Sequence, residues 1–206
     1  MTATQLPMPT LSQTLWPVTQ SSSFVRQAIL AITGSLLLWV SAKIQVPLWP
    51  VPMTMQTYVV LALAAFMGRR LAVTTVLLYL LEGLAGLPVF AGSVAGPAYF
   101  VGTTTGYLVG FLLAAYMVGY MAERGWDRKI LPALLMMTAG HVIIFISGLT
   151  WLIILNPKAL GLVDSLTFAY QVGLQPFWLA TILKTTLAML TMPFLWQLVK
   201  SRKISS

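Results

Sequence analysis

The fold is decided by one stretch of sequence, Val60-Leu61-Ala62-Leu63-Ala64-Ala65-Phe66-Met67-Gly68-Arg69-Arg70-Leu71-Ala72-Val73-Thr74-Thr75-Val76-Leu77-Leu78. Two apolar segments flank a tight basic turn, so the chain reverses at a cluster of positive charge between two segments that avoid water. Loops on the cytoplasmic side of membrane proteins are enriched in Lys and Arg. The stretch is therefore typical of two membrane-spanning helices joined on the cytoplasmic side.

The same pattern recurs along the whole chain of 206 residues, which has 12 Lys and Arg, 4 Asp and Glu, and 58% hydrophobic residues. Most of the basic residues fall in four clusters between apolar segments: Arg26; Arg69 and Arg70; Arg124, Arg128 and Lys129; Lys200, Arg202 and Lys203. Charged residues make up only 8% of the chain, against about 25% in a soluble domain. We therefore expect a multi-pass protein of the cell membrane.

Spans of about 20 apolar residues are needed to cross a bilayer as helices. We predict an all-α protein with six transmembrane helices at about 27–46, 53–67, 71–90, 98–121, 130–155 and 177–199. An even number of crossings places both termini on the basic, cytoplasmic side. Residues 1–23 are expected to be a polar, flexible cytoplasmic tail, residues 24–200 the membrane domain, and residues 201–206 a basic C-terminal tail.

Composition also excludes several functions. The chain has no Cys, one His and four carboxylates, so a metal site or an intramembrane catalytic constellation is hard to assemble, and we expect no enzyme activity and no cofactor. The positive charge flanks apolar spans, where it meets lipid headgroups. It is not read as a nucleic-acid surface.

Four ionisable residues lie within or near the predicted spans. Lys184 lies well inside the last span, where a lysine costs about 2.5–3.5 kcal/mol to insert, and we favour an anion-binding role over snorkelling to the interface. The position of Lys43 near the outer end of the first span is equally consistent with binding a ligand anion and with snorkelling to the interface. Glu82 is either a ligand contact or a structural partner. His141 is better read as a structural hydrogen-bond donor between helices than as a ligand contact.

The unusual sequence gathers in the outer half of the membrane. The Pro-rich segment 47–52 and the Gly-rich segment 91–97 lie there with Gln56, Tyr107, Trp151 and Lys184. Irregular backbone at membrane depth is tolerated only where it lines a cavity or is buried in protein. We expect an outward-opening pocket for a small, partly apolar acid.

Small residues form two stripes at four-residue spacing. Gly102, Gly106, Gly110 and Ala114 are expected mainly to pack helices within the chain, because small residues let backbones approach closely. Ala31 and Ser35, at the cytoplasmic half of the first span, are the predicted docking face for a partner protein.

Two long motifs carry a family resemblance: Ser41-Ala42-Lys43-Ile44-Gln45-Val46-Pro47-Leu48-Trp49-Pro50-Val51-Pro52-Met53-Thr54-Met55-Gln56-Thr57 and Gly86-Leu87-Pro88-Val89-Phe90-Ala91-Gly92. With Gly106 to Phe111 and Leu183-Lys184, they resemble the BioY family, the biotin-binding S-components of energy-coupling factor (ECF) vitamin transporters. The resemblance implies a six-helix fold, an outward biotin pocket, and a module of one transmembrane coupling protein and two ATPases. Thr181, Leu108 and Val94 stand where members often have Asp, Arg and Asn; Thr181 is included among the expected contacts.

Two alternatives within transport remain beside biotin uptake. One is an S-component for another small vitamin, against which the outer-segment motifs argue. The other is a self-sufficient secondary transporter, a class usually built from internal repeats; the two halves of this chain show no convincing repeat.

Overall fold

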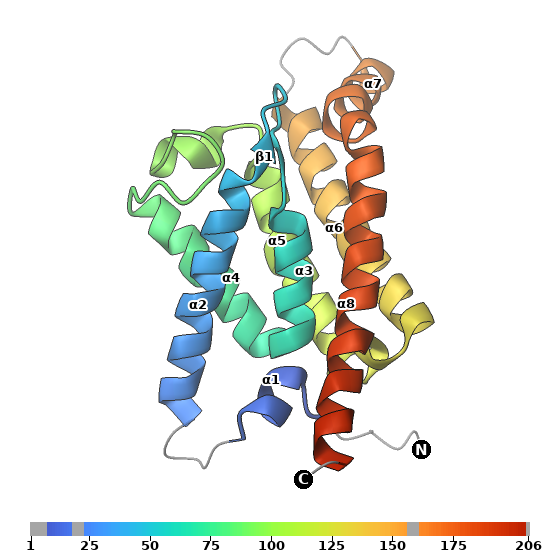
Figure 1. Cartoon of the computed structure of the whole chain (residues 1–206). Helices are drawn as coiled ribbons and strands as arrows, with labels where there is room; N and C mark the ends of the chain where they lie inside the picture. Colours follow the sequence, from blue (N-terminus) through green and yellow to red (C-terminus); the bar gives the residue numbers. More distant parts are fainter. Residues whose placement is uncertain (1–7, 18–22, 156–160, 205–206) are drawn as a thin grey trace, which may run out of the picture.

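A bundle of long helices makes up the computed structural model, which describes residues 8–17, 23–155 and 161–204 (Figure 1). The α-helices are α1 (Leu11–Leu15), α2 (Ser23–Lys43), α3 (Gln56–Met67), α4 (Arg69–Leu84), α5 (Thr105–Ala122), α6 (Ile130–Leu155), α7 (Leu162–Gly173) and α8 (Trp178–Ile204). The strands β1 (Gln45–Val46) and β2 (Met53–Thr54) and the short 3-10 helices η2 (Pro97–Val101), η3 (Trp126–Arg128) and η4 (Gln175–Phe177) connect them.

The described helices confirm a helical membrane protein. Four apolar segments are long enough to cross a membrane: Ser23–Lys43, Thr105–Ala122, Ile130–Leu155 and, within Leu162–Ser201, α8. The helix α3 is apolar but shorter, because Gly68 ends it with a φ of 81° that other residues rarely adopt, and α4 starts at once. The basic turn predicted between the second and third spans lies at this glycine.

Two helices were not predicted from the sequence. The helix α7 occupies part of the region expected to be the loop 156–175, and it packs beside α6 through Ser165, Ala169 and Gly173. Asp164 lies in the first turn of this helix, and the charged residue favoured a loop prediction for the region. Residues 156–160, including Lys158, lie outside the described residues.

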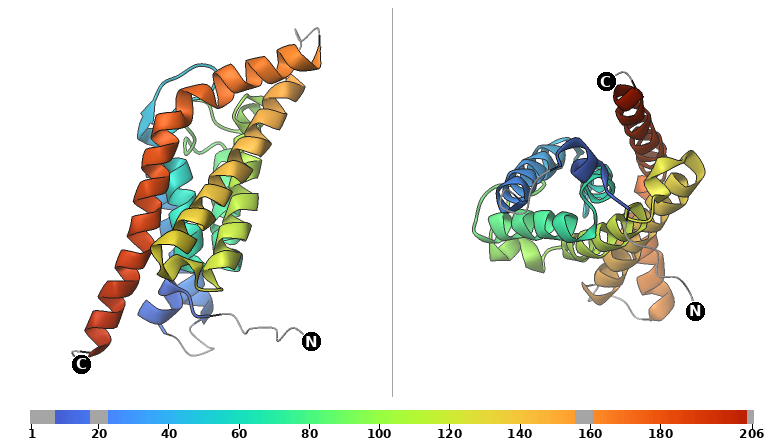
Figure 2. Two further views of the ribbon diagram at one scale, coloured as in Figure 1. Left: turned by 90° about the vertical axis from the view of Figure 1, so that its right-hand side faces the viewer. Right: turned by 90° about the horizontal axis from the view of Figure 1, so that it is seen from below.

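The helix α1 corrects the expectation that residues 1–23 form a flexible tail. Leu11 is fully buried, the Met8 amide donates to the Glu123 carbonyl at 2.7 Å, and Arg26 Nη2 donates to Ser12 Oγ at 3.3 Å. Residues 8–17 are thus packed against the bundle, near α3 and the end of α8 (Figure 2). Residues 1–7 and 18–22 of the expected tail lie outside the described residues. At the other terminus α8 continues to Ile204, into the expected basic tail.

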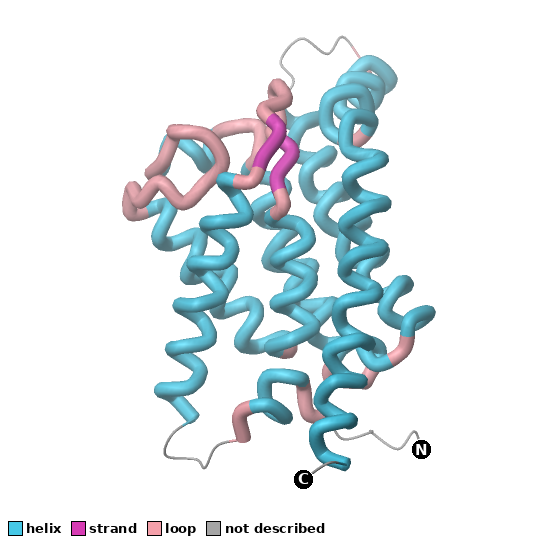
Figure 3. The backbone as a smooth tube through the Cα atoms, in the orientation of Figure 1, coloured by secondary structure: helices cyan, strands magenta, loops and turns pink. Residues whose placement is uncertain are grey.

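The two ends of the bundle differ in kind. At one end lie α1, the last turns of α8 and the short turns between α3 and α4 and between α5 and α6, where Arg69 Nε pairs with Glu123 at 3.2 Å. At the other end the long connections gather with the strands and α7 (Figure 3). The strands pair antiparallel, Gln45 with Thr54 and Val46 with Met53, where the sequence predicted the ends of helical spans.

The predicted glycine stripe packs helices within the chain. A Cβ at Gly106 would lie 2.3 Å from Trp151 Cβ and 2.5 Å from the Ser147 carbonyl oxygen, and one at Gly110 would lie 2.8 Å from Ile144 Cα. Helices α5 and α6 therefore meet backbone to backbone. Gly102 precedes α5 and lies outside this contact.

We predict that Gly106→Ala lowers the free energy of unfolding by about 1–3 kcal/mol, because overpacking a tight contact forces the backbones apart. Gly161→Ala is the matched control, since a Cβ there would meet nothing within 4 Å and the backbone is extended. Thermal unfolding of both variants in detergent checks the prediction. Equal stability of the two variants would contradict the close α5–α6 approach.

Candidate functional site

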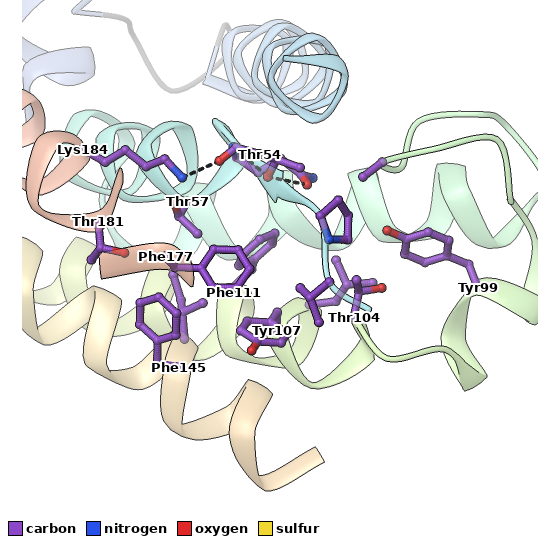
Figure 4. Close-up of a pocket in the computed structure, with 16 residues that line it drawn as sticks. Thr54, Thr57, Tyr99, Thr104, Tyr107, Phe111, Phe145, Phe177, Thr181 and Lys184 are labelled. Carbon is purple, nitrogen blue, oxygen red and sulfur yellow. Dashed lines mark hydrogen bonds between the residues drawn. The ribbon is translucent and has the colours of Figure 1, made fainter. Parts of the chain in front are cut away.

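A small pocket lies at the end of the bundle where the long connections gather (Figure 4). Its volume is about 50 Å³, and its walls come from the β2 region, α3, the 91–104 connection, α5, α6, η4 and α8. The lining residues are Val51, Pro52, Thr54, Gln56, Thr57, Ala91, Tyr99, Thr104, Tyr107, Leu108, Phe111, Ile144, Phe145, Phe177, Thr181 and Lys184.

Lys184 is the one charged residue among those lining residues. It is only 8% exposed, and its Nζ donates to the Thr54 carbonyl at 2.5 Å (Figure 4). An ammonium group has three donors, so the remaining donors are available to an anion that enters the pocket. Lys184 is therefore a buried cation in the wall of a cavity, and its anion-binding role stays a prediction.

Polar groups converge on the same region from α3 and β2. Gln56 is buried; its Nε2 donates to the Tyr79 hydroxyl at 2.7 Å, and its Oε1 accepts from Thr54 Oγ1 at 3.1 Å. Thr54 therefore contacts both Lys184, through its carbonyl, and Gln56, through its hydroxyl. Thr54 of strand β2 thus helps to position both the Lys184 ammonium group and the Gln56 amide.

The remaining walls are mostly aromatic. Phe111, Phe145 and Phe177 lie beside one another, with Tyr107 next to them (Figure 4). Tyr107 donates its hydroxyl to the Gly173 carbonyl at 2.8 Å, which ties α5 to the end of α7. Such walls exclude water, which strengthens any hydrogen bond made to Lys184 or Gln56.

Tyr99 adds a hydroxyl from the η2 segment, outside the long helices. Burial raises the pKa of Tyr99 above its ordinary value, and hydrogen bonds with Thr104 and Ala91 act in the opposite direction. The phenol is therefore neutral at physiological pH and retains its donor proton.

The pocket has a small volume. A water molecule occupies about 30 Å³ of liquid, and pockets for small organic ligands are about 300–1,000 Å³. The volume of this pocket lies below that range. Lys184 and Thr54, which are joined by a hydrogen bond, also line an apolar groove of about 300 Å³ between the β-hairpin and α8.

Of the predicted contacts, Lys184, Gln56, Tyr107 and Thr181 line this pocket. Trp151 does not line it and donates its Nε1 to the Gly102 carbonyl at 2.8 Å. His141 does not line it: it is 3% exposed, its Nδ1 lies 3.1 Å from both Met137 O and Thr185 Oγ1, and it faces a separate groove between α6 and α8. The contact with Thr185 joins α6 to α8, and the choice between a structural and a ligand-binding role for His141 stays a prediction.

Lys43 and Glu82 are not brought to the pocket. Lys43 Nζ donates to the carbonyls of Phe90 and Gly92, at 2.7 and 3.1 Å, and so fastens the Gly-rich connection. Glu82 accepts a hydrogen bond from the Ser35 hydroxyl, joining α4 to α2. In the described chain both side chains bond to the protein and neither lines this pocket; their contact with a ligand stays a prediction.

Ala31 and Ser35, the predicted docking face, are also turned inward. They are 6% and 1% exposed, and α2 packs against α4 on this side. The small side chains bring two helices of the same chain together, so they are not available to a partner while α4 keeps its place.

Comparison with known proteins agrees with this architecture. The model of the BioY family matches residues 9–201. The chain belongs to the BioY family.

Curated relatives of this BioY protein carry the same family name. It is 31% identical over 154 residues to "Biotin transporter BioY2" of Lactococcus lactis subsp. cremoris, covering 75% of this chain and 81% of the relative. It is 42% identical over 100 residues to "Biotin transporter BioY" of Thermotoga maritima, a match that spans 48% of this chain and 59% of the relative.

A solved structure shares the fold. The crystal structure of the S-component for biotin from an ECF-type ABC transporter superposes with a TM-score of 0.73 at 19% identity, covering 87% of the BioY chain and 95% of the solved one. At this identity the likeness concerns the fold.

Several lining residues of the BioY pocket were missed from the sequence. Thr54 and Thr57 lie inside the quoted motif, but hydroxyl residues are common in membrane helices and their loops. Phe145 and Phe177 are aromatic residues in apolar surroundings, which core packing explains equally well. Among the residues that differ from those that family members often have, Leu108 lines the pocket, whereas Val94 is exposed and lies outside the lining.

We predict that Lys43→Met loosens the Gly-rich connection, because it removes both donors to Phe90 and Gly92. Hydrogen exchange followed by mass spectrometry should show faster exchange of backbone amides in residues 85–96. Lys129→Met, at the opposite end of the bundle, is the control. Unchanged exchange in Lys43→Met would contradict the fastening role.

Proposed function

We propose that this chain is the biotin-binding subunit of an uptake system of the cell membrane. The observation that carries the proposal is Lys184, a buried cation within a pocket otherwise lined by aromatic, aliphatic and neutral polar side chains. Biotin combines a carboxylate, an apolar chain and a ureido ring. Lys184 suits the carboxylate, the aromatic wall suits the chain, and the amide and hydroxyl groups suit the ring. The names of the relatives support this ligand.

The proposal includes the arrangement in the membrane. Helices α2, α3, α4, α5, α6 and α8 correspond to the six predicted spans, with both termini on the cytoplasmic side. Support comes from the basic residues at the end of the bundle that holds α1 and the last turns of α8. The pocket is at the opposite end and accordingly opens outward.

Active uptake requires partners in this proposal. The chain is a transport subunit and not an enzyme, and it has no G-x-x-x-x-G-K-[ST] motif for binding nucleotide phosphates. We propose a module of one transmembrane coupling protein and two ATPase subunits, as the ECF class of the solved relative supports. Docking through Ala31 and Ser35 is not part of this proposal, given their burial.

We predict that Lys184→Met weakens biotin binding by about 2–5 kcal/mol, because a desolvated carboxylate loses its charged partner. Mass spectrometry of ligand retained by the purified protein should find biotin with the wild-type chain and not with Lys184→Met. Lys129→Met, at an exposed position on the opposite end of the bundle, is the matched control and should retain biotin. Equal retention by Lys184→Met and the wild type would contradict the role of Lys184.

Single cysteines test the orientation, since the chain has none of its own. Ser93→Cys and Arg70→Cys place thiols at exposed positions on opposite ends of the bundle. A membrane-impermeant maleimide added to intact cells should label Ser93→Cys, and Arg70→Cys only after permeabilisation. The reverse pattern would contradict an outward pocket.

A further inference from the structure

A relay of hydrogen bonds leads from Gln56 in the pocket through Tyr79 to the connection between α4 and η2. Gln56 Nε2 donates to the Tyr79 hydroxyl at 2.7 Å, and that hydroxyl donates to the Val89 carbonyl at 2.9 Å. Tyr79 is fully buried on α4 and does not line the pocket. Its ring packs edge-on against Phe90, with centroids 5.4 Å apart, so the hydroxyl has a fixed position.

The relay determines which way the Gln56 amide faces. The Val89 carbonyl can only accept, so the single hydroxyl proton of Tyr79 is used there. The Tyr79 oxygen can then only accept from Gln56, which must present its NH₂ group to Tyr79. At the other side of the amide, Thr54 Oγ1 accepts from the Gln56 backbone amide at 3.3 Å and donates to Oε1 at 3.1 Å. Tyr79 therefore selects the amide orientation, and the Thr54 hydroxyl donates to the amide oxygen in that orientation.

The fixed amide keeps a free donor and a free acceptor. A glutamine side chain has two N–H donors and two acceptor lone pairs, and the relay uses one of each. A cyclic urea likewise offers N–H donors next to a carbonyl acceptor, so one remaining donor and one remaining acceptor match it. A flipped amide would place its oxygen against the Tyr79 oxygen and would reverse this match.

We infer that Tyr79 is a positioning residue for specificity, which holds Gln56 in the orientation that recognises the ureido group of the ligand. The inference rests on the proposed function, because it assumes a ureido ligand in this pocket. The Val89 carbonyl is the last acceptor of the relay. It lies in the connection that Lys43 fastens through Phe90.

The test uses Tyr79→Phe in the full chain, which keeps the ring and its packing but removes the hydroxyl. Dissociation constants are measured for biotin, for desthiobiotin, which keeps the ureido ring without the sulfur, and for a thiolane-pentanoate analogue, which lacks the ureido ring. Tyr58→Phe is the matched control, since the Tyr58 hydroxyl pairs with Thr191 Oγ1 between α3 and α8, away from the pocket.

We expect Tyr79→Phe to weaken both ureido ligands by roughly three- to tenfold, the effect of one hydrogen bond, and to leave the thiolane analogue unchanged. Tyr58→Phe should change none of the three. Equal weakening of all three ligands by Tyr79→Phe would show a packing role and overturn the inference, as would unchanged binding of biotin.

A second measurement asks whether Tyr79 acts through Gln56. In a Gln56→Leu background, Tyr79→Phe should cause no further loss of biotin affinity; an additional loss of the same size would overturn the inference. Absence of biotin binding by the wild-type chain would overturn the proposed function itself. Wild-type binding with an unaffected Tyr79→Phe variant would overturn only the role of Tyr79.

Discussion

The hydrogen bond from Lys184 to the Thr54 carbonyl is the contact on which the site depends. A lysine deep in the last helix is costly in a membrane and persists only with polar partners. Because Thr54 lies in strand β2, its carbonyl can accept from Lys184. In the middle of a helix that carbonyl would accept from a backbone amide four residues later. The same residue orders Gln56 through its hydroxyl. The charged and amide parts of the pocket are therefore held by one short piece of extended chain.

The acceptor in that contact is a neutral carbonyl. The Lys184 ammonium group donates one hydrogen bond to it and has two further donors. A carboxylate is the stronger acceptor, since charge-assisted hydrogen bonds are roughly twice as strong as neutral ones. The arrival of an anion thus competes with the bond that joins the β-hairpin to α8, at the boundary between the pocket and the outer groove.

The sequence predicted what depends on hydropathy and on rare residues. Apolar segments bounded by Arg and Lys clusters located the long helices, and Lys184 stood out because lysine is rare in such a segment. Lys43 looked similar but fastens a loop, because its role depends on where the carbonyls of Phe90 and Gly92 lie, which no local pattern encodes. The helices α1 and α7 are held largely by tertiary packing and have short or mixed apolar patterns. Ala31 and Ser35 are buried because α4 packs against α2. The same spacing of small residues would also suit a helix of a partner protein, so the sequence could not distinguish the two.

The shortness of α3 has a consequence for distance. Its 12 residues rise about 18 Å from Gly68 at the basic end to Gln56 in the pocket. The hydrocarbon layer of a bilayer is about 30 Å thick. The helix is therefore about 12 Å too short to cross the layer, and with Gly68 at one face of the layer Gln56 lies only a little beyond its middle. The strands and the connections around Gln56 have to supply the rest of the thickness.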